Sequence, residues 1–498
     1  MSTSNPSPST PAGTHAIVYG GSIAGMMSAG VLSRHFERVT LVERDRFPDG
    51  PQPRKGVPQA LHIHGLLTRG MDILAGILPG IREDLEAAGG EFLDVVGSVA
   101  SFGAGSWRPR FSSGVKAASM SRLLLEWVIR QRLQALANVC ILDGREAVGF
   151  QTSADRTRVT GLQLQAPGGG QEETLEAELV VDASGRGSRT PQWLEALGHP
   201  RVEETRIHVD VGYATRLYRK PQGFDPGWLS LALSPELPKE RRLGIIQDIE
   251  AHRWLVTLGG WLGDFPATAD EAVFLEFARG LPQPHLYEAI KNAEPLGPVH
   301  LYRFPHHQRR HYERMSRFPE GLAVVGDAFC SFNPIYGQGM STGAMQAEAL
   351  GECLRQGVHG AADRYRRRAG EILTGPWALA TAGDLGFPEV KGKRPPGFGL
   401  MSWYGNRFQQ LAGYDEEAMT AFARVQHMIE SPAAMFSPRM VLKVLTVRPE
   451  KAAQTPGPQP LAASSTRAAC ASRHLRLPHT SLHPAGSGGW GRGKHCPA

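Results

Sequence analysis

No stretch of this sequence approaches the roughly 18 consecutive apolar residues that a membrane-spanning helix needs. The N-terminus, Met1–Thr14, is rich in Ser, Thr and Pro, and it has neither the basic start nor the apolar core of a secretory signal. Both absences predict a cytoplasmic protein with no integral membrane segment. Residues 1–13 are expected to form a flexible leader.

Cysteine is scarce as well, and none of the five cysteines belongs to a Cys-x-x-Cys pair. Structural zinc sites usually bring Cys and His ligands together at such short spacings. No metal site is therefore predicted.

Acidic residues are absent from the last part of the chain. Beyond residue 450 there are six Lys or Arg and no Asp or Glu, which leaves 48 residues of each sign before it. The formal charge of +6 thus belongs to one terminal segment, so the folded part is not expected to bind nucleic acid. Pro, Ser, Ala, Gly and Arg dominate this segment without periodicity, which predicts a disordered tail over 449–498.

What the sequence does contain begins with a strand–turn–helix–strand pattern. His15–Tyr19 is a short apolar run, Ile23–His35 has helical spacing, and Val39–Glu43 is a second apolar run that ends in an acid. About thirty residues hold all of this, which is the size of a βαβ unit.

The turn of this unit carries a glycine motif. Gly20, Ser22 and Gly25 occupy the three glycine places of G-x-G-x-x-G, with Ser22 in the middle. The first glycine permits a tight turn, the last lets the helix approach the strand, and the helix N-terminus can face a pyrophosphate. Glu43 can accept ribose hydroxyls at the end of the next strand. The motif predicts a dinucleotide and does not choose between FAD and NAD; the alternative is a glycine-rich turn beside a surface Glu.

Two later segments point to the flavin. In Val180–Arg189 an apolar strand runs through Asp182 into a turn of small residues. In Leu322–Ser341 a strand ends on Gly326 and Asp327, and a Pro/Gly loop then opens a helix. Asp327 can bind ribityl hydroxyls, and backbone N–H groups at the helix start can face the pyrimidine edge of a flavin. The loop residues concerned are Pro334, Gly337, Gly339 and Met340.

Together the three segments resemble the FAD-dependent monooxygenases of the aromatic-hydroxylase and squalene-epoxidase type. The resemblance covers about residues 14–450 and is most specific over Gly326–Ser341. It implies that all three segments contact FAD. It also implies that Arg122, at the start of a helix expected over Ser119–Leu136, reaches the FAD phosphates; the alternative is an ordinary surface arginine.

Within that family, Arg54–Leu66 resembles a bacterial subgroup of natural-product tailoring enzymes, polyether-type alkene epoxidases among them. The resemblance suggests that this loop packs beside the flavin, with Arg54 as the charged residue nearest the ring. His64 is a candidate catalytic acid or base, although a structural or cofactor-packing role of His62 and His64 is favoured over that reading. A second basic run, Arg303–His311, is either a solvated loop or a site for the phosphates of NADPH.

The expected fold is α/β: a Rossmann-like FAD-binding domain with an interleaved β-rich substrate domain and C-terminal helices. The expected boundaries are 14–78, 118–190 and 320–360 for the FAD-binding domain, 79–117 and 191–319 for the substrate domain, and 361–448 for the helices.

The resemblance implies a monooxygenase that uses NADPH or NADH and O2 and forms a flavin C4a-hydroperoxide. It also implies that this species epoxidises or hydroxylates an apolar, isoprenoid- or polyketide-like intermediate of antibiotic biosynthesis. A flavin-dependent halogenase is disfavoured because the Trp-x-Trp-x-Ile-Pro signature is missing. A reductase of prenyl double bonds and a flavin-binding protein without turnover remain alternatives.

Overall fold

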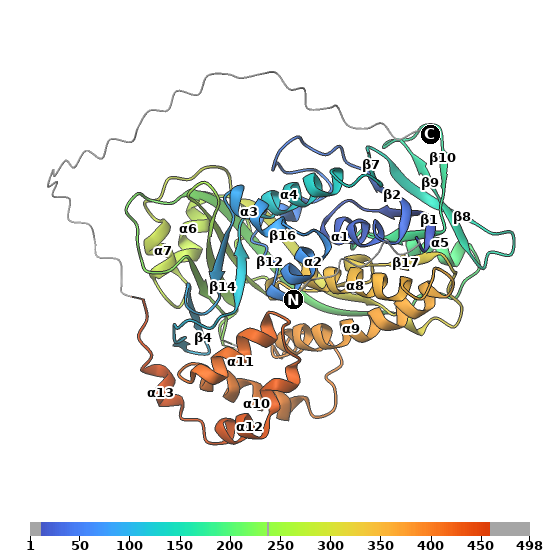
Figure 1. Ribbon diagram of the computed structural model, residues 1–498. Coiled ribbons are helices and arrows are strands. Elements are labelled where there is room, and N and C mark those ends of the chain that lie inside the picture. Colours follow the sequence, from blue (N-terminus) through green and yellow to red (C-terminus); the bar gives the residue numbers. More distant parts are fainter. Residues whose placement is uncertain (1–10, 237–238, 459–498) are drawn as a thin grey trace, which may run out of the picture.

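The computed structural model describes residues 11–236 and 239–458 (Figure 1). Most of the expected leader and residues 459–498 of the expected tail lie outside this range. The predicted α/β class is confirmed. Figure 1 shows one sheet with its covering helices on the right, a second sheet on the left, and the last helices below both.

The first sheet is parallel, and its five strands run in the order β17-β11-β1-β2-β7. The side chains of β1, β11 and β17 are almost entirely buried, as expected for a parallel sheet that is covered on both faces. The strands are β1 (Gly13–Tyr19), β2 (Phe36–Glu43), β7 (Val139–Asp143), β11 (Leu179–Asp182) and β17 (Leu322–Val324).

Helices drawn from distant parts of the chain cover this sheet. Helix α1 packs on both α8 and α4, and α8 in turn packs on α2 and α9. Small residues and glycines fill α1 and α8, so the two helices approach closely. These helices are α1 (Ile23–Leu32), α2 (Thr68–Ile77), α4 (Arg122–Gln134), α8 (Gly339–Leu354) and α9 (Ala361–Asp384), with α3 (Ile81–Ala87) packed against α4.

The second sheet has eight strands in the order β18-β16-β12-β15-β14-β13-β4-β5, mostly antiparallel. Helices α6 (Glu271–Arg279) and α7 (His285–Ile290) pack against β15 and β14. The strands are β4 (Val99–Gly103), β5 (Ser106–Trp107), β12 (Glu204–Arg219), β13 (Ser230–Leu233), β14 (Arg242–Ile249), β15 (Arg253–Trp261), β16 (His300–Arg310) and β18 (Cys330–Ser331).

Smaller elements complete the fold. A three-stranded sheet consists of β8 (Glu146–Thr152), β9 (Val159–Gln165) and β10 (Glu173–Glu176), and β3 (Glu91–Asp94) pairs with β6 (Lys116–Ser119). Helix α5 (Thr190–Ala196) follows β11. The last helices are α10 (Phe398–Leu411), α11 (Glu416–Gln426), α12 (Pro438–Leu445) and α13 (Pro449–Ala453).

Two sequence-based expectations are corrected here. The expected tail begins too early, because α13 buries Ala452 and the Thr455 hydroxyl donates to the Gly413 carbonyl at 2.6 Å. The basic run Arg303–His311 is no solvated loop: it lies largely in β16, where Arg309 and Arg310 are buried and paired with Glu313 and Glu204. Among the described residues, no helix is long and apolar enough to cross a membrane.

Candidate functional site

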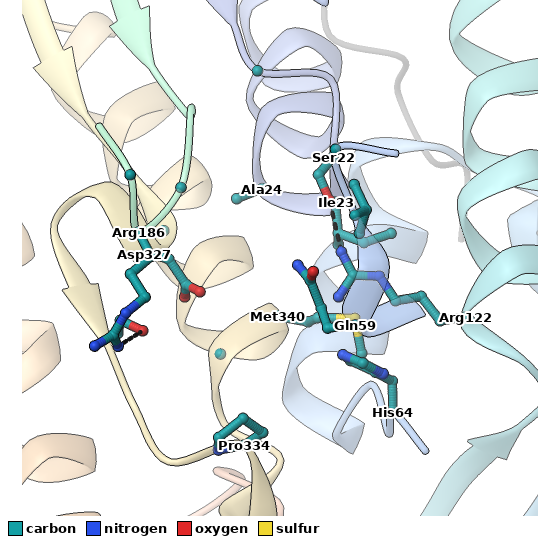
Figure 2. A pocket seen from close by; sticks show the side chains of 18 of the residues that line it. Ser22, Ile23, Ala24, Gln59, His64, Arg122, Arg186, Asp327, Pro334 and Met340 are labelled. Carbon is teal, nitrogen blue, oxygen red and sulfur yellow. Dashed lines mark hydrogen bonds between the residues drawn. The ribbon is translucent and has the colours of Figure 1, made fainter. Parts of the chain in front are cut away.

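A cavity of about 530 Å³ lies where the carboxyl ends of the parallel strands meet the face of the antiparallel sheet. Most of the residues singled out in the sequence line it. They are Gly20, Ser22, Glu43, Arg54, His64, Arg122, Gly326, Asp327, Pro334, Gly337, Gly339 and Met340. Figure 2 shows Asp327, Arg186 and Pro334 on one side of this space and Arg122, Gln59 and His64 on the other.

The glycine turn after β1 requires glycine for reasons of space. Gly20 has a φ of +105°, and a Cβ there would lie 2.3 Å from the Ala183 carbonyl oxygen. A Cβ on Gly25 would lie 1.8 Å from the Gly20 carbonyl oxygen. Gly25 does not line the cavity, so its role is to let α1 pack against the turn.

Two helix N-termini face the cavity without a capping side chain. Helix α1 begins after Ser22 and α8 begins after Gln338, and neither residue caps its helix with a side-chain hydrogen bond. Neither helix has an acidic residue in its first turn. The N–H groups at both ends therefore remain available to an anionic or electron-rich ligand.

Arg122 lies beside the first of these termini. Its Nη2 donates to the Ser22 hydroxyl at 2.6 Å, while its buried Nε makes no hydrogen bond with the described residues and lies 3.8 Å from the Glu126 carboxylate. Burial lowers the pKa of Arg122, and the nearby carboxylates of Glu126 and Asp327 oppose that shift. The guanidinium is thus a positive group beside the turn, and part of its donor capacity is unused.

Asp327 occupies the opposite wall, after the short strand β17. Burial raises the pKa of its carboxyl group, although Arg122, Arg186 and Arg310 lower it. No described residue donates a hydrogen bond to this carboxylate. Asp327 is half-buried and lines the cavity, so hydroxyl groups of a bound ligand could donate hydrogen bonds to its carboxylate.

Asp182 was predicted to contact the cofactor, but it does not line the cavity. Its carboxylate is fully buried and accepts hydrogen bonds from the Ser184 N–H at 2.8 Å, the Thr190 hydroxyl at 2.7 Å and the Ser188 hydroxyl. Asp182 therefore holds the turn of small residues in shape, and Ser184–Gly187 of that turn reach the cavity instead.

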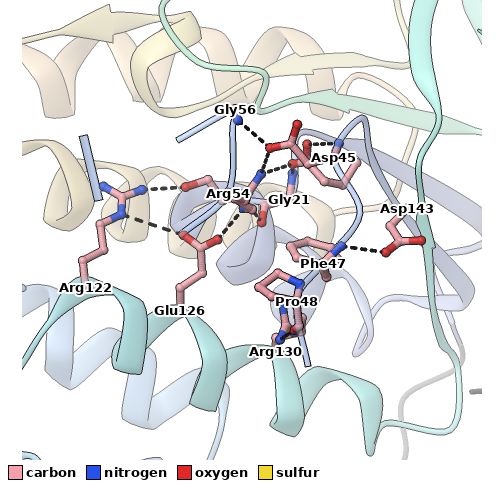
Figure 3. Close-up of polar contacts among 12 residues, drawn as sticks. Gly21, Asp45, Phe47, Pro48, Arg54, Gly56, Arg122, Glu126, Arg130 and Asp143 are labelled. Carbon is pink, nitrogen blue, oxygen red and sulfur yellow. Dashed lines mark hydrogen bonds and ion pairs between the residues drawn. The ribbon is translucent and has the colours of Figure 1, made fainter. Parts of the chain in front are cut away.

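Arg54 is held by three carboxylates, as Figure 3 shows. Its guanidinium lies 3.1 Å from Glu43, 3.2 Å from Asp45 and 2.9 Å from Glu126, and it also donates to the Gly21 carbonyl at 3.1 Å. The side chain is only 6% exposed. Its hydrogen-bonding capacity is used within the protein, where it ties residues 54–56 to the glycine turn.

Glu43 ends β2, as the sequence predicted for a residue that binds ribose. One carboxylate oxygen accepts from the Gly21 N–H at 2.8 Å and the other from the Asp45 N–H at 2.9 Å. Each carboxylate oxygen has a second acceptor site, and the residue lines the cavity. Ribose binding by Glu43 stays a prediction that this geometry permits.

His62 and His64 follow a short 3₁₀ helix, Pro58–Leu61, rather than lying on a strand. The His62 Nδ1 lies 2.7 Å from the Thr215 hydroxyl, which lies 2.7 Å from the Thr257 hydroxyl. The His64 Nδ1 donates to the His62 carbonyl at 3.0 Å. Burial lowers the pKa of His62 to about 4 and that of His64 to about 3. Both rings are neutral near pH 7.

The lining changes in character along the cavity. Six arginines and three acidic residues line it, namely Arg44, Arg54, Arg122, Arg145, Arg186 and Arg189 against Glu43, Glu146 and Asp327. This excess of positive charge suits an anionic ligand. The antiparallel sheet contributes an apolar and aromatic wall: Tyr213, Leu243, Ile245, Tyr302 and Phe304, with Phe332 and Ile335 from the loop after Asp327.

Sequence reasoning missed this wall and several polar lining residues. Gln59 lines the cavity on the same side as Arg122 and His64. Arg186 donates to the Ser331 hydroxyl at 3.1 Å, and its Cζ lies 4.7 Å from the centre of the Phe304 ring. The Arg186 turn could have been flagged from its position after Asp182. No short-range signal marks Tyr302 or Ile245, which belong to strands far from the motifs. No metal-binding group of His, Cys, Asp and Glu occurs among the described residues.

These features fit FAD. The uncapped α1 terminus and the Arg122 guanidinium suit a pyrophosphate, the donor-free Asp327 carboxylate suits ribityl hydroxyls, and the α8 terminus suits the pyrimidine edge of a flavin.

Comparisons with known proteins agree with this cofactor. Residues 16–190 match the family described as FAD dependent oxidoreductase. Protein Rv3254 of Mycobacterium tuberculosis is 34% identical over 425 residues, which are 81% of this chain and 86% of that protein. A 3-(3-hydroxy-phenyl)propionate/3-hydroxycinnamic acid hydroxylase of Burkholderia vietnamiensis is 27% identical over 355 residues, which are 70% of this chain and 57% of that protein.

The fold also matches solved structures. The crystal structure of p-nitrophenol 4-monooxygenase PnpA from Pseudomonas putida has a TM-score of 0.60 to this chain. The match covers 84% of this chain and 99% of PnpA at 17% sequence identity. At that identity the comparison establishes a shared fold.

Proposed function

We infer the function from one premise: the chain belongs to the FAD-dependent oxidoreductase family and is a flavoenzyme. We propose that it is an FAD-dependent monooxygenase that takes electrons from NADPH or NADH and inserts one oxygen atom of O2 into an apolar substrate by hydroxylation or epoxidation. The matched hydroxylase and the shared fold with PnpA support the monooxygenase reaction.

The observation that carries this proposal is the single cavity that joins a cofactor cradle to an apolar wall. In the proposal, Glu43 binds the ribose, Arg122 and the α1 terminus bind the pyrophosphate, and Asp327 binds the ribityl chain. Gly337–Met340 present backbone N–H groups to the pyrimidine edge. When bound, FAD would pass two electrons from NADPH or NADH to O2, so that one oxygen atom of O2 enters the substrate and the other leaves as water.

The protein's own part is to orient the substrate and to exclude water. Leu243, Ile245 and Phe304 contribute an apolar surface, and the Thr257 hydroxyl offers one polar contact. This lining supports an apolar, isoprenoid- or polyketide-like substrate, and we propose a role in natural-product tailoring.

Arg54 and His64 take different roles in this proposal. Arg54 is engaged by three carboxylates, so we assign it to positioning of the loop that follows the glycine turn rather than to catalysis. His64 is neutral near pH 7 and lies beside Arg122 in the cavity. We propose that its Nε2 accepts a hydrogen bond from cofactor or substrate.

The test is a set of oxygen-dependence measurements on the purified protein. We expect a bound-flavin spectrum, oxidation of NADPH or NADH that a substrate accelerates, and incorporation of ¹⁸O from labelled O2 into product. The substrate panel contains polyenes, prenylated quinones and phenols. A protein whose spectrum does not change on addition of FAD would contradict the proposal. Reduction of a prenyl substrate without O2 would replace it with the reductase alternative, and FAD binding without turnover of any of these would favour a flavin-binding protein.

A further inference from the structure

A polar cluster lies directly behind the cavity wall, and all but one of its members are buried. It consists of Asp384, His307, Asn333, Tyr336 and Trp261, which we call the Asp384 cluster. Asp384, His307 and Asn333 each have 0% exposure. Asp384 is the last residue of α9, His307 lies in β16, and Asn333 lies in the loop after β18. Trp261 ends β15, and Tyr336 lies in a short 3₁₀ helix, Pro334–Tyr336. No role assigned above uses this cluster.

The Asp384 carboxylate accepts hydrogen bonds from every other member of the cluster. Oδ1 accepts from the Trp261 Nε1 at 2.7 Å and from the Tyr336 hydroxyl at 2.7 Å. The Asn333 Nδ2 lies 3.3 Å and 3.2 Å from the two carboxylate oxygens, and Oδ2 also accepts from the His307 Nε2. So many donors balance the desolvation of one buried charge.

Hydrogen-bond geometry fixes the protonation of the histidine. The Asn333 backbone N–H donates to the His307 Nδ1 at 3.1 Å, so Nδ1 must be an acceptor. The ring hydrogen then lies on Nε2 and is donated to Asp384. The Asn333 Oδ1 accepts from the Tyr213 hydroxyl at 2.6 Å, which leaves the amide one orientation. His307 is therefore neutral and Asp384 is ionised, and the hydrogen bonds of the cluster have one consistent set of donors and acceptors.

The cluster touches the cavity through one loop. Asn333, Pro334, Ile335 and Gly337 line the cavity, and Asn333 and Tyr336 bind Asp384 from behind it. The same loop leads into the α8 N-terminus. We propose that Asp384 is a positioning residue: its cluster fixes the loop Asn333–Gly337 against β15, β16 and α9, and so sets how this loop meets the flavin. This inference rests on the proposed function, since the loop faces FAD only if FAD binds in the cavity.

The two tyrosines fit this arrangement. Burial raises the pKa of Tyr336 and of Tyr213 well above the usual value, and the negative charge of Asp384 raises both further. Both hydroxyls therefore stay protonated and act as donors, Tyr336 to Asp384 and Tyr213 to Asn333.

A neighbouring glycine gives the proposal a steric test that removes no polar group from the cluster. Gly383 precedes Asp384, and a Cβ there would lie 2.3 Å from the Tyr336 hydroxyl and 3.0 Å from its Cζ. Gly383→Ala must push the Tyr336 hydroxyl away from Asp384. Gly375 lies in the same helix with nothing within 4 Å of its Cβ position, so Gly375→Ala is the matched control.

The first experiment compares these two variants with the wild type. In the apoprotein, amide hydrogen exchange of residues 332–338 should accelerate in Gly383→Ala and stay unchanged in Gly375→Ala. With FAD, Gly383→Ala should bind roughly 10-fold more weakly, the equivalent of one lost hydrogen bond to a charged group. The midpoint potential of the bound flavin should also move. A Gly383→Ala protein that matches Gly375→Ala in all three measurements would overturn the proposal.

The second experiment removes the charge. Asp384→Asn places an amide N–H₂ opposite the donors of His307 and Asn333, so we expect faster amide hydrogen exchange in the loop. The midpoint potential of the flavin should shift to more positive values, because a buried negative charge beside the site is gone. The control is Asp94→Asn, whose carboxylate accepts five hydrogen bonds from backbone and Ser113 in a turn outside the cavity. An unchanged potential and unchanged loop exchange would overturn the proposal.

The two inferences fail in different ways. If the wild type binds no FAD, the proposed function is wrong, but loop exchange in the apoproteins still tests the cluster. If the wild type binds FAD and the Gly383 and Asp384 variants behave as their controls do, the cluster has no positioning role and the proposed function stands. If Asp384→Asn does not fold, Gly383→Ala and Tyr336→Phe, which deletes one donor only, carry the test.

Discussion

The parallel-sheet region and the antiparallel-sheet region build their sides of the cavity differently. In the parallel region, backbone shape dominates: Gly20 has a positive φ, Gly25 touches the Gly20 carbonyl, and two helix termini present free N–H groups. In the antiparallel region, side chains from separate strands dominate, as in the Asp384 cluster and in the chain from His62 through Thr215 to Thr257.

The difference bears on what each region tolerates. A backbone-built cradle fails when atoms are added, because a Cβ has nowhere to go. A side-chain-built wall fails when a partner is removed, because the remaining buried polar group loses its hydrogen bond. Substitutions that add volume or remove partners should therefore separate the two regions.

The largest effect is expected from added volume in the parallel region. Gly25→Ala places a Cβ 1.8 Å from a backbone oxygen that cannot move without opening the turn. We expect a loss of more than about 4 kcal/mol in the free energy of unfolding, beyond ordinary overpacking, measured by urea denaturation. Gly76→Ala in α2 has nothing within 4 Å and should be neutral. A stable Gly25→Ala protein would show that the turn is not limited by close contact.

The next effect concerns the charges that tie the loop to this turn. Arg54→Met leaves Glu43 and Asp45 without their cation and Glu126 with Arg122 alone, and the expected loss of stability is roughly 3 kcal/mol. Arg82→Met is the control, since Arg82 also pairs with an Asp and lies over a Phe ring, but at the surface. It should cost less than about 1 kcal/mol. Equal losses in the two variants would contradict a special role of the buried cluster.

Asp327 tests the cofactor side directly. Asp327→Ala removes a carboxylate that lines the cavity and accepts no hydrogen bond from the described residues. We expect FAD to bind roughly 100-fold more weakly, equivalent to about 2.7 kcal/mol, by titration of flavin fluorescence. Asp155→Ala, in an exposed turn, should leave the affinity at the wild-type value. Full affinity in Asp327→Ala would remove our assignment of this residue.

The smallest effect tests the antiparallel side through pH. Burial lowers the pKa of His62 to about 4 in the folded protein, whereas an unfolded chain binds the proton near pH 6.5. Stability from the neutral ring is therefore present above pH 6.5 and is lost as the pH falls, by roughly 2 kcal/mol at pH 4.5.

The measurement is urea denaturation of wild type and His62→Gln at pH 7.5 and pH 4.5. The variant should lose less stability than the wild type between these values, and His359→Gln, at an exposed site, should follow the wild type. If His62→Gln loses as much as the wild type, burial of His62 does not govern this pH dependence.

The α/β class is confirmed, and most of the predicted cofactor residues line one cavity, because both depend on short-range constraints. Gly20 and Ser22 follow β1, and only α1 and β2 separate them from Glu43, while the connection from Asp327 to the start of α8 spans about a dozen residues. Their spacing alone brings them to the ends of neighbouring strands. The helix expected over Ile23–His35 is α1, which ends at Leu32, and the apolar run Val39–Glu43 is the second part of β2.

Other expectations did not anticipate which groups pair or pack within the fold. The run Arg303–His311 was expected to be a solvated loop or a phosphate site, but it lies largely in a sheet, where Arg309 and Arg310 pair with Glu313 and Glu204. Asp182 was expected to contact the cofactor, but four donor atoms of Ser184, Ser188 and Thr190 occupy its carboxylate, which does not line the cavity. Residues 449–458 were expected to be disordered, yet they pack on the body of the protein.

The sequence by itself determined the glycine turns, the strand that ends at Asp327 and the residues that can face FAD, because each depends on backbone conformation within a few residues. Only the tertiary structure decided which side chains form the opposite wall and which charges are already paired. Asp384 and His307 are 77 residues apart, and no local pattern shows that they meet. That contact depends on how α9 packs against the antiparallel sheet, which is a property of the whole fold.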